Sequence, residues 1–262
     1  MDLDRRTVLG LAAGVATVGV AGAARAQAGV HTLKVGDPLE RFAWLKPGVR
    51  VYLRSQQKGE QHSPADIWRR ETRIETIDGV QRLRIVQRWD GGGATPTLAE
   101  RDSVFELGTF RPLSHIRIST RDGTRMVEGF RFTGEGVVGL PDLAGNMHAG
   151  LSVPFDEPMF NFETDLEMLQ TLPLAAGYSV SIPFFHPGPT SKPARYLWSV
   201  TGDETLMGPD GRGIDCWIVQ TDYNAPPRPP ARFGLAKAGQ QLIRQEAATP
   251  DGTVHRKLLL PL

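Results

Sequence analysis

Apolar and polar residues alternate with a period of two over most of the chain. In residues 82–88 the charged members are Arg82, Arg84 and Arg88, and Leu83, Ile85 and Gln87 stand between them. Because successive side chains of a strand point to opposite faces, this run predicts a strand with one dry face and one wet face. Ten to thirteen such runs recur at a spacing of roughly 8–12 residues, which predicts a mainly antiparallel β protein.

The dipeptide Asp-Gly marks many of the boundaries between these runs. It occurs at Asp78-Gly79, Asp90-Gly91, Asp122-Gly123, Asp210-Gly211 and Asp251-Gly252. A two-residue hairpin turn needs positive φ at both central positions, which Asp tolerates and Gly adopts freely. We therefore predict that these dipeptides form hairpin turns.

One segment near the middle of the chain breaks the period of two. Apolar residues recur there at helical spacing: Phe162, Leu166, Leu169 and Leu172. Pro173 follows them, and proline cannot continue the hydrogen-bond ladder of a helix. The pattern predicts a single short amphipathic helix around residues 161–172.

The start and the length of this helix lead to the predicted fold. Thr164 and Glu167 have the spacing of a capping box. A helix of about ten residues is too short to persist alone in water, so its apolar stripe must be buried. We predict a mainly β fold: a curled antiparallel sheet, half-barrel or clam-like, with the helix filling the concavity or closing its mouth as a lid. Pro158 and Gly177 mark segment ends that can act as hinges, which favours the lid.

Residues 1–26 have the features of an export signal. Arg5-Arg6 precedes an apolar stretch rich in glycine and alanine, and Ala24-Arg25-Ala26 forms an A-x-A cleavage site. The weak hydrophobicity and the arginine pair favour the twin-arginine route. We predict cleavage after Ala26, a periplasmic location, and one β-rich domain over residues 27–262.

Charge and composition exclude several function classes. The chain has 30 basic and 29 acidic residues, and without residues 1–26, which hold three Arg and two Asp, the numbers are 27 and 27. A neutral chain predicts no nucleic-acid partner. No later segment approaches 18 consecutive apolar residues, so the sequence predicts no transmembrane segment after residue 26. One cysteine, and six histidines of which no two lie within five residues, predict no metal site and no cofactor.

Candidate catalytic groups have simpler structural explanations. Cys216 has no neighbouring base in the sequence, and a free cysteine is among the most buried residue types, so we predict that it packs in the core. Acidic residues gather around the predicted helix start: Asp156, Glu157, Glu163, Asp165 and Glu167. Because acids near a helix N-terminus interact favourably with its dipole, they do not by themselves predict a catalytic pair. No residue is predicted to be catalytic.

Several short motifs, in order, resemble those of one family. They are the segments 109–115 (TFRPLSH), 122–134 (DGTRMVEGFRFTG), 172–178 (LPLAAGY), 198–204 (WSVTGDE), 215–219 (DCWIV) and 242–246 (LIRQE). Together they span most of residues 27–262 and resemble the exported bacterial domain-of-unknown-function 3108 family. The resemblance implies a curled antiparallel sheet similar to the periplasmic lipoprotein-carrier fold, and no catalytic residues. The arginine-rich strands are more polar than a groove for fatty-acyl chains requires.

The expected function is binding by an exported protein. Its ligand would be an apolar or amphipathic small molecule, or its partner a protein of the cell envelope. The candidate ligand-binding residues are those of the expected inner face: Phe160, Phe162, Leu166, Leu169, Phe184, Phe185, Trp198 and Trp217. Two alternatives stay open, an envelope hydrolase that uses carboxylates brought together by the fold, and a structural or assembly factor that binds a partner along a sheet edge.

Overall fold

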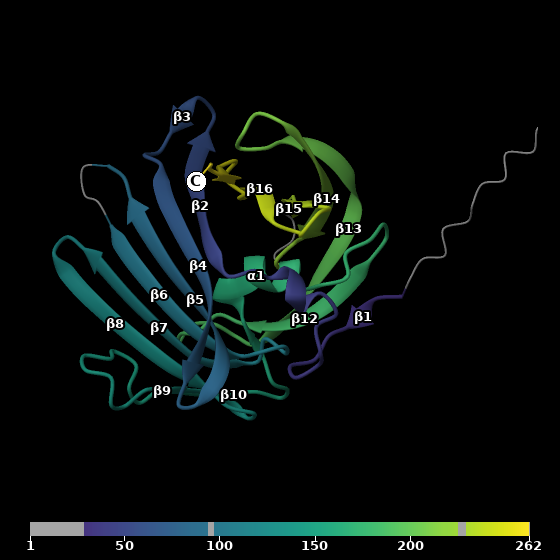
Figure 1. The fold of residues 1–262 in the computed structure, drawn as a ribbon. Coiled ribbons are helices and arrows are strands. Elements are labelled where there is room, and N and C mark those ends of the chain that lie inside the picture. The colour runs from purple at the N-terminus through teal and green to yellow at the C-terminus, as the bar shows by residue number, and fades with distance from the viewer. Residues whose placement is uncertain (1–28, 94–96, 225–228, 262) are drawn as a thin grey trace, which may run out of the picture.

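The alternating segments assemble into one long curled sheet. The computed structural model describes residues 29–93, 97–224 and 229–261, so the predicted export signal lies outside the described residues. Within them, 17 strands pair into a single sheet that is not closed into a barrel. Two curled halves face each other, and the one α-helix of the described residues lies between them (Figure 1).

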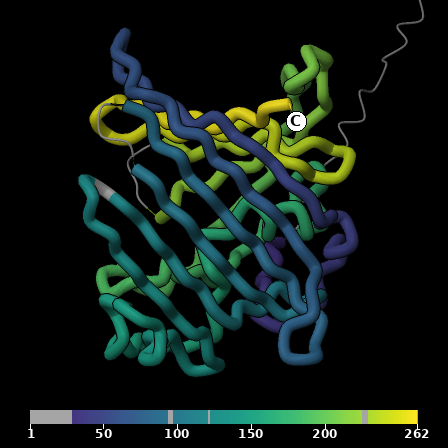
Figure 2. The backbone as a smooth tube through the Cα atoms, turned by 60° about the vertical axis from the view of Figure 1, so that its left-hand side comes forward, coloured from purple at the N-terminus to yellow at the C-terminus, as the bar shows by residue number. Residues whose placement is uncertain are grey.

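The first half, named the N-terminal half-sheet here, is an antiparallel meander. Figure 2 shows its long strands side by side, coloured from blue to teal. Its strands are β2 (Gly48–Lys58), β3 (Gln61–His62), β4 (Asp66–Ile77), β5 (Val80–Gly91), β6 (Leu98–Glu106), β7 (Pro112–Arg121), β8 (Thr124–Phe132), β9 (Gly136–Gly139) and β10 (Ser152–Pro154). β2 pairs with both β3 and β4, and from β4 to β10 each strand pairs with the next along the chain.

The second half, the C-terminal half-sheet, is a second antiparallel meander. Its strands are β12 (Ser179–Phe185), β13 (Ala194–Met207), β14 (Gly213–Thr221), β15 (Ala231–Ala236), β16 (Leu242–Ala248) and β17 (Val254–Leu259). β17 pairs with β2 and joins the two halves. On the far side, β12 pairs in parallel with two short strands, β1 (His31–Thr32) and β11 (Phe160–Asn161).

Two of the five predicted Asp-Gly turns are two-residue hairpins. Asp78 and Asp122 both have a φ of 50°, and the flanking residues pair directly across each turn. Asp210-Gly211 and Asp251-Gly252 lie in longer loops, each with its glycine at positive φ. The prediction for Asp90-Gly91 is wrong, because Gly91 still pairs with Asp66 at the end of β5 and the chain turns after it.

The central helix is shorter than predicted. It consists of a 3-10 turn, η2 (Phe162–Thr164), that leads directly into α1 (Asp165–Gln170). A separate 3-10 turn, η1 (Phe42–Trp44), precedes β2. The predicted capping box does not form: the hydroxyl of Thr164 donates to the carbonyl of Asn161, and Glu167 binds an arginine of the sheet. Among the described residues, no helix has both the length and the apolar composition to cross a membrane.

The helix fills the concavity, so the expectation of a lid is wrong. All six residues of α1 are buried, including Asp165, Glu167 and Gln170 on its polar side. Leu166 and Leu169 belong to the main core cluster, which also holds inner-face residues of both half-sheets. A lid would leave one side of the helix in solvent, whereas here the sheet covers both the apolar and the polar side.

Candidate ligand-binding cleft

A row of polar side chains crosses the concave face of the N-terminal half-sheet. Register places Arg70 of β4 opposite Gln87 of β5, Gln87 opposite Arg101 of β6, and Arg101 opposite Arg117 of β7. Cβ atoms on one strand alternate between faces, so residues in register share a face. We call Arg70, Arg101 and Arg117 the arginine row. Arg70 is buried and Arg101 and Arg117 are half-buried, because the helical segment lies on the row.

The arginine row holds the first turns of the helical segment through ion pairs. Arg70 donates to both carboxylate oxygens of Glu167, at 2.7 and 2.5 Å, and both side chains are less than a tenth exposed. Arg101 and Arg117 bind the two oxygens of Glu163 at 2.5 and 3.1 Å. Burial opposes the ionisation of Glu163, but His186 and these arginines outweigh it and hold its pKa well below its usual range. Glu163 is therefore an ionised anchor rather than a general acid.

The opposite end of the helix is held by one side chain. The amide nitrogen of Gln240 lies 3.1, 3.0 and 2.8 Å from the carbonyl oxygens of Leu169, Gln170 and Leu172. The last carbonyls of a helix have no partner within it, so a buried helix end needs such donors. With both ends fixed, the helix forms a rigid floor for the space above it.

A first cavity lies beside the arginine row, about two residues further along the same strands, and we call it the rim cavity. Its volume is about 370 Å³. Trp89, Ala99, Ser119 and Met126, which are neighbours in register on four strands, form its wall, and Arg101 lies beneath them. Ala99 and Ser119, in the middle of this wall, are small and leave room between the larger Trp89 and Met126. The cavity thus combines an apolar wall with a guanidinium.

The second cavity, the aromatic cavity, lies against the C-terminal half-sheet and has a volume of about 440 Å³. Its lining consists of Phe162, His186, Tyr196, Tyr223, Pro229, Ala231, Ala247, Ala248, Thr249 and His255. Phe162 stacks on His186 with ring centroids 4.3 Å apart and meets Tyr196 edge to face at 4.9 Å. Aromatic walls with a few polar groups are typical of small-molecule sites.

The linings of the two cavities come together on paired strands, because Arg54 of the rim cavity lies on β2 and His255 of the aromatic cavity lies on β17, which pairs with β2. Lys257, opposite Arg54, and the indoles of Trp68 and Trp89 form a column of cations and indoles there. Trp68 and Trp89 stack with ring centroids 3.9 Å apart. Lys257 Nζ lies 4.5 Å from the Trp68 ring, and the guanidinium carbon of Arg101 lies 3.4 Å from the Trp89 ring. Arg54 of the rim cavity lies beside both indoles and binds Asp66 through its Nε at 2.6 Å. We call the two cavities and this column the cleft.

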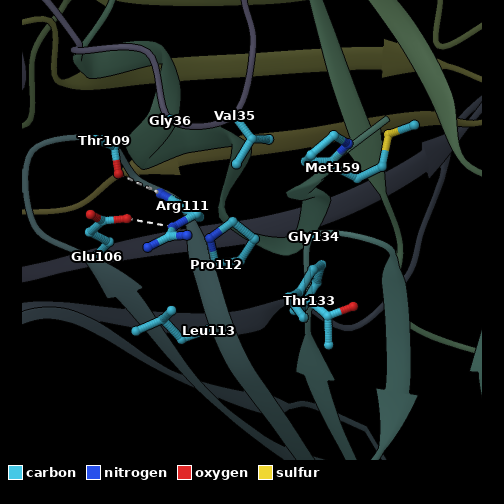
Figure 3. A pocket seen from close by; sticks show the side chains of 12 residues that line it. Val35, Gly36, Glu106, Thr109, Arg111, Pro112, Leu113, Thr133, Gly134 and Met159 are labelled. Atoms are coloured by element: carbon cyan, nitrogen blue, oxygen red, sulfur yellow. Dashed lines mark hydrogen bonds and ion pairs between the residues drawn. The ribbon is translucent and has the colours of Figure 1, made fainter. Parts of the chain in front are cut away.

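A third cavity lies among the turns at the ends of β6, β7 and β8. Val35, Arg111, Leu113, Thr133 and Met159 are among its lining residues, and its volume is about 380 Å³ (Figure 3). Its charged side chains already pair with each other, because Arg111 Nε donates to Glu106 at 2.5 Å. Among its described lining residues, this turn cavity has no counterpart of the aromatic stacks that surround the other two cavities.

The structure places the eight predicted ligand-binding residues mostly in the core. Of these, Phe162 lines the aromatic cavity. Phe160, Leu166, Leu169, Phe184 and Trp198 are buried in the main core cluster, Phe185 belongs to a second cluster, and Trp217 is half-buried under Lys237. Their assignment to a ligand remains a prediction.

Sequence reasoning missed the polar half of the cleft. It assigned the arginines of residues 82–88 to a wet face, and those three do lie on the outer face of β5. Arg70, Arg101 and Arg117 lie on the inner face instead. A signal existed, because the buried carboxylates Glu163 and Glu167 required cationic partners, but the strand register that supplies them is not visible in the sequence.

The predicted candidates for catalysis also have structural partners. Cys216 is buried with Leu206, Ala236 and Ile243, which confirms the prediction of core packing, and burial raises the pKa of its thiol to about 11. Glu157 pairs with Arg195 at 2.5 Å. Burial raises the pKa of Asp165. No group of three His, Cys, Asp or Glu residues within the described ranges is arranged to hold a metal ion.

Comparisons with known proteins agree with this architecture. No curated protein matches the chain. Among solved structures, the crystal structure of a β-barrel-like protein of domain of unknown function DUF1849 from Brucella abortus is similar, with 8% sequence identity and a TM-score of 0.50. The match covers 82% of this chain and 95% of that chain, and at this identity it shows a shared fold.

The sequence itself carries the family assignment. The profile described as "Protein of unknown function (DUF3108)" matches residues 63–259, from just before β4 to the end of β17. That range includes the arginine row, the helix and all the lining residues of the aromatic cavity. The motif-based resemblance is therefore confirmed, and the chain belongs to the DUF3108 family of proteins of unknown function.

Proposed function

We propose that this protein is an exported binding protein whose cleft takes up an amphipathic small molecule. The observation that carries the proposal is the pairing of two adjoining cavities of different chemistry. The aromatic cavity, at about 440 Å³, is walled by Phe162, Tyr196 and Tyr223, while the lining of the rim cavity includes the ion-paired Arg54 and Asp66 together with Arg101. A molecule with an apolar part and a polar head matches this division.

The fixed helix supports binding without a large rearrangement. Ion pairs hold its start to the arginine row and Gln240 holds its end. Most small-molecule sites are largely formed before the ligand arrives, and a rigid floor lowers the entropy cost of binding. The ligand would enter the cleft above the helix, and the core beneath would stay closed.

A cavity-filling substitution tests this proposal. We expect Ala247→Phe to weaken binding of an apolar fluorescent probe at least tenfold, because Ala247 lines the aromatic cavity. Ala238→Phe, on an exposed turn, adds the same bulk elsewhere and should bind like the unsubstituted protein. Equal weakening in both variants, or no saturable binding to the unsubstituted protein, would contradict the proposal. Native mass spectrometry of protein purified from the periplasm would show whether a small molecule copurifies.

The export part of the proposal rests on Arg5-Arg6 and the weakly hydrophobic segment that follows. We expect replacement of both arginines by lysine to trap the precursor in the cytoplasm. Fractionation and immunoblotting would measure the processed fraction, and a block of the general secretory route serves as the control. Normal processing of the twin-lysine precursor would contradict the twin-arginine route and leave only export itself.

A further inference from the structure

Most cations of the concave face already have an anionic partner. Arg70 binds Glu167, Arg101 and Arg117 bind Glu163, and Arg54 binds Asp66. These ion pairs neutralise the arginines before any ligand arrives. A cation that recognises a ligand should instead face the cleft with its charge uncompensated.

Lys257 is such a cation. It lies on β17 between the cavities, opposite Arg54 of the rim cavity and two residues from His255 of the aromatic cavity. Its side chain is half-buried, and its ammonium lies 4.5 Å from the ring of Trp68. Within the described ranges, no carboxylate oxygen comes within ion-pair distance, 4.0 Å, of this ammonium. A cation–π contact stabilises the charge without neutralising it.

Both cationic and anionic groups surround Lys257, but within the described residues none of the carboxylates forms an ion pair with it. Glu167 and Asp165 of the helix face it, as do Arg54, Arg70 and His255, and Glu167 is already bound to Arg70. Asp165 lies beyond ion-pair distance, and its Oδ1 accepts a hydrogen bond from the Leu166 amide at 2.8 Å. Burial lowers the pKa of Lys257 to about 8, with Arg70 and Arg54 lowering it further and Asp165 and Glu167 raising it. An anion in direct contact with the ammonium would stabilise its charged form against this desolvation.

Two buried polar atoms next to Lys257 also lack partners. The indole N–H of Trp68, whose ring lies under the ammonium, has no hydrogen-bond partner, and neither does the side-chain oxygen of Gln245, the residue opposite Lys257 on β16. A buried donor or acceptor without a partner destabilises the folded protein. Such groups persist where a ligand or water satisfies them, so they mark the same place as the unpaired charge.

We infer that the cleft selects anionic amphiphiles, and that Lys257 binds the acidic head while the apolar chain lies in the aromatic cavity. The ligand class is a single apolar chain that ends in a carboxylate, phosphate or sulfate. This inference rests on the proposed binding function and adds the sign of the ligand's charge. The ammonium supplies the charge interaction, and Phe162, Tyr196 and Tyr223 supply the apolar contact.

A matched pair of probes separates the charge from the chain. We would titrate 11-(dansylamino)undecanoic acid and its methyl ester, which share chain and fluorophore, at pH 7. We expect the unsubstituted protein to bind the acid at least tenfold more tightly than the ester. Lys257→Met keeps most of the apolar stem and should bind both equally, whereas Lys257→Arg should keep the preference. Lys58→Met, which removes an exposed lysine paired with Asp251, is the control.

The outcomes distinguish the two proposals. If neither probe binds the unsubstituted protein, the proposed binding function fails, and this inference fails with it. If acid and ester bind equally well to the unsubstituted protein, the inference alone is overturned. A preference that survives in Lys257→Met, shown to be folded by circular dichroism, overturns the assignment to Lys257. Competition by dodecanoate, dodecyl phosphate and dodecyl sulfate then identifies the head group.

Discussion

The two half-sheets hold the same helix by different physics. The N-terminal half-sheet binds it through charges, with Arg70, Arg101 and Arg117 on Glu163 and Glu167. The C-terminal half-sheet contributes apolar and aromatic residues such as Ile182, Phe184 and Trp198 to the core cluster that holds the leucines of the helix. Gln240, between β15 and β16, adds polar contacts with the end of the helix. Apolar contacts stabilise the packing of the helix but do little to fix its orientation, because the hydrophobic effect is non-directional. A buried ion pair fixes the orientation of its two partners, at a high cost in desolvation.

This difference explains why the space for a ligand lies above the helix. The apolar side alone would let the helix slide or rotate, because hydrophobic contacts tolerate small shifts. The carboxylates of Glu163 and Glu167 fix its rotation against the arginine row. The helix therefore fills the bottom of the concavity in one orientation and leaves the cleft above it open.

We expect the largest loss of stability from breaking the ion pair between Arg70 and Glu167. Arg70→Met leaves Glu167 buried without its partner, and we expect a loss of about 3–5 kcal/mol in the free energy of unfolding. The double variant Arg70→Met with Glu167→Leu removes both charges and should regain most of that loss. Urea denaturation measures both. Arg88→Met, which disrupts an exposed pair, is the control and should change stability little.

Additive losses in the double variant would contradict this reading. The helix would then depend on each charge separately, for instance through other partners, rather than on the ion pair between Arg70 and Glu167.

The apolar side gives the next effect. Leu169 is fully buried in the main core cluster, so Leu169→Ala should cost about 2–5 kcal/mol, the range for a large-to-small core change. Leu197→Ala, at a side chain that is 47% exposed, should change stability far less. Thermal unfolding measures both variants. A small loss for Leu169→Ala would favour a helix that lies loosely on the sheet, as a lid would.

The sequence predicted the apolar side of this comparison better than the charged side. Alternation predicts strands and their two faces, and the spacing of Phe162, Leu166 and Leu169 predicted the helix that sits between them. Alternation does not tell which face is inner when both carry arginines. Arg70 and Arg69 are neighbours in the sequence, yet one is buried and the other half-buried on the opposite face. Only the register of four strands, β4 to β7, brings the arginine row onto Glu163 and Glu167.

Protonation offers a smaller perturbation of the charged side. His115 is fully buried next to the arginine row, and burial lowers its pKa from 6.5 to about 3. Above pH 6.5 neither state binds the proton, whereas between 6.5 and 3 the unfolded chain binds it and the folded protein does not. Stability must therefore fall as the pH falls, by at most about 1.4 kcal/mol per pH unit from this group.

The window from pH 6.5 down to 4.5 separates this effect from that of Glu163, which begins to contribute below the ordinary glutamate pKa of 4.5. We expect a loss of about 2–3 kcal/mol over these two pH units. His115→Gln retains a partner for Ser103, which lies 2.8 Å from the imidazole, and should flatten the dependence. His62→Gln, at an exposed histidine, is the control. An unchanged slope in His115→Gln would assign the dependence elsewhere, for instance to His255, whose pKa burial also lowers.

The smallest expected effect comes from the outer face of the C-terminal half-sheet. Cys216 alternates with the inward-facing Trp217 and packs with Leu206 and Ile243, away from the helix. Cys216→Ala should cost at most about 1–2 kcal/mol through a small cavity, and it should leave probe binding in the cleft unchanged. The raised pKa of about 11 keeps the thiol protonated at neutral pH, so the native protein should react slowly with a thiol reagent. Fast labelling, or a loss of probe binding in Cys216→Ala, would show that the outer face is coupled to the helix. Packing on the outer face of the C-terminal half-sheet would then influence the helix and the cleft, and the difference between the two half-sheets would not depend on their concave faces alone.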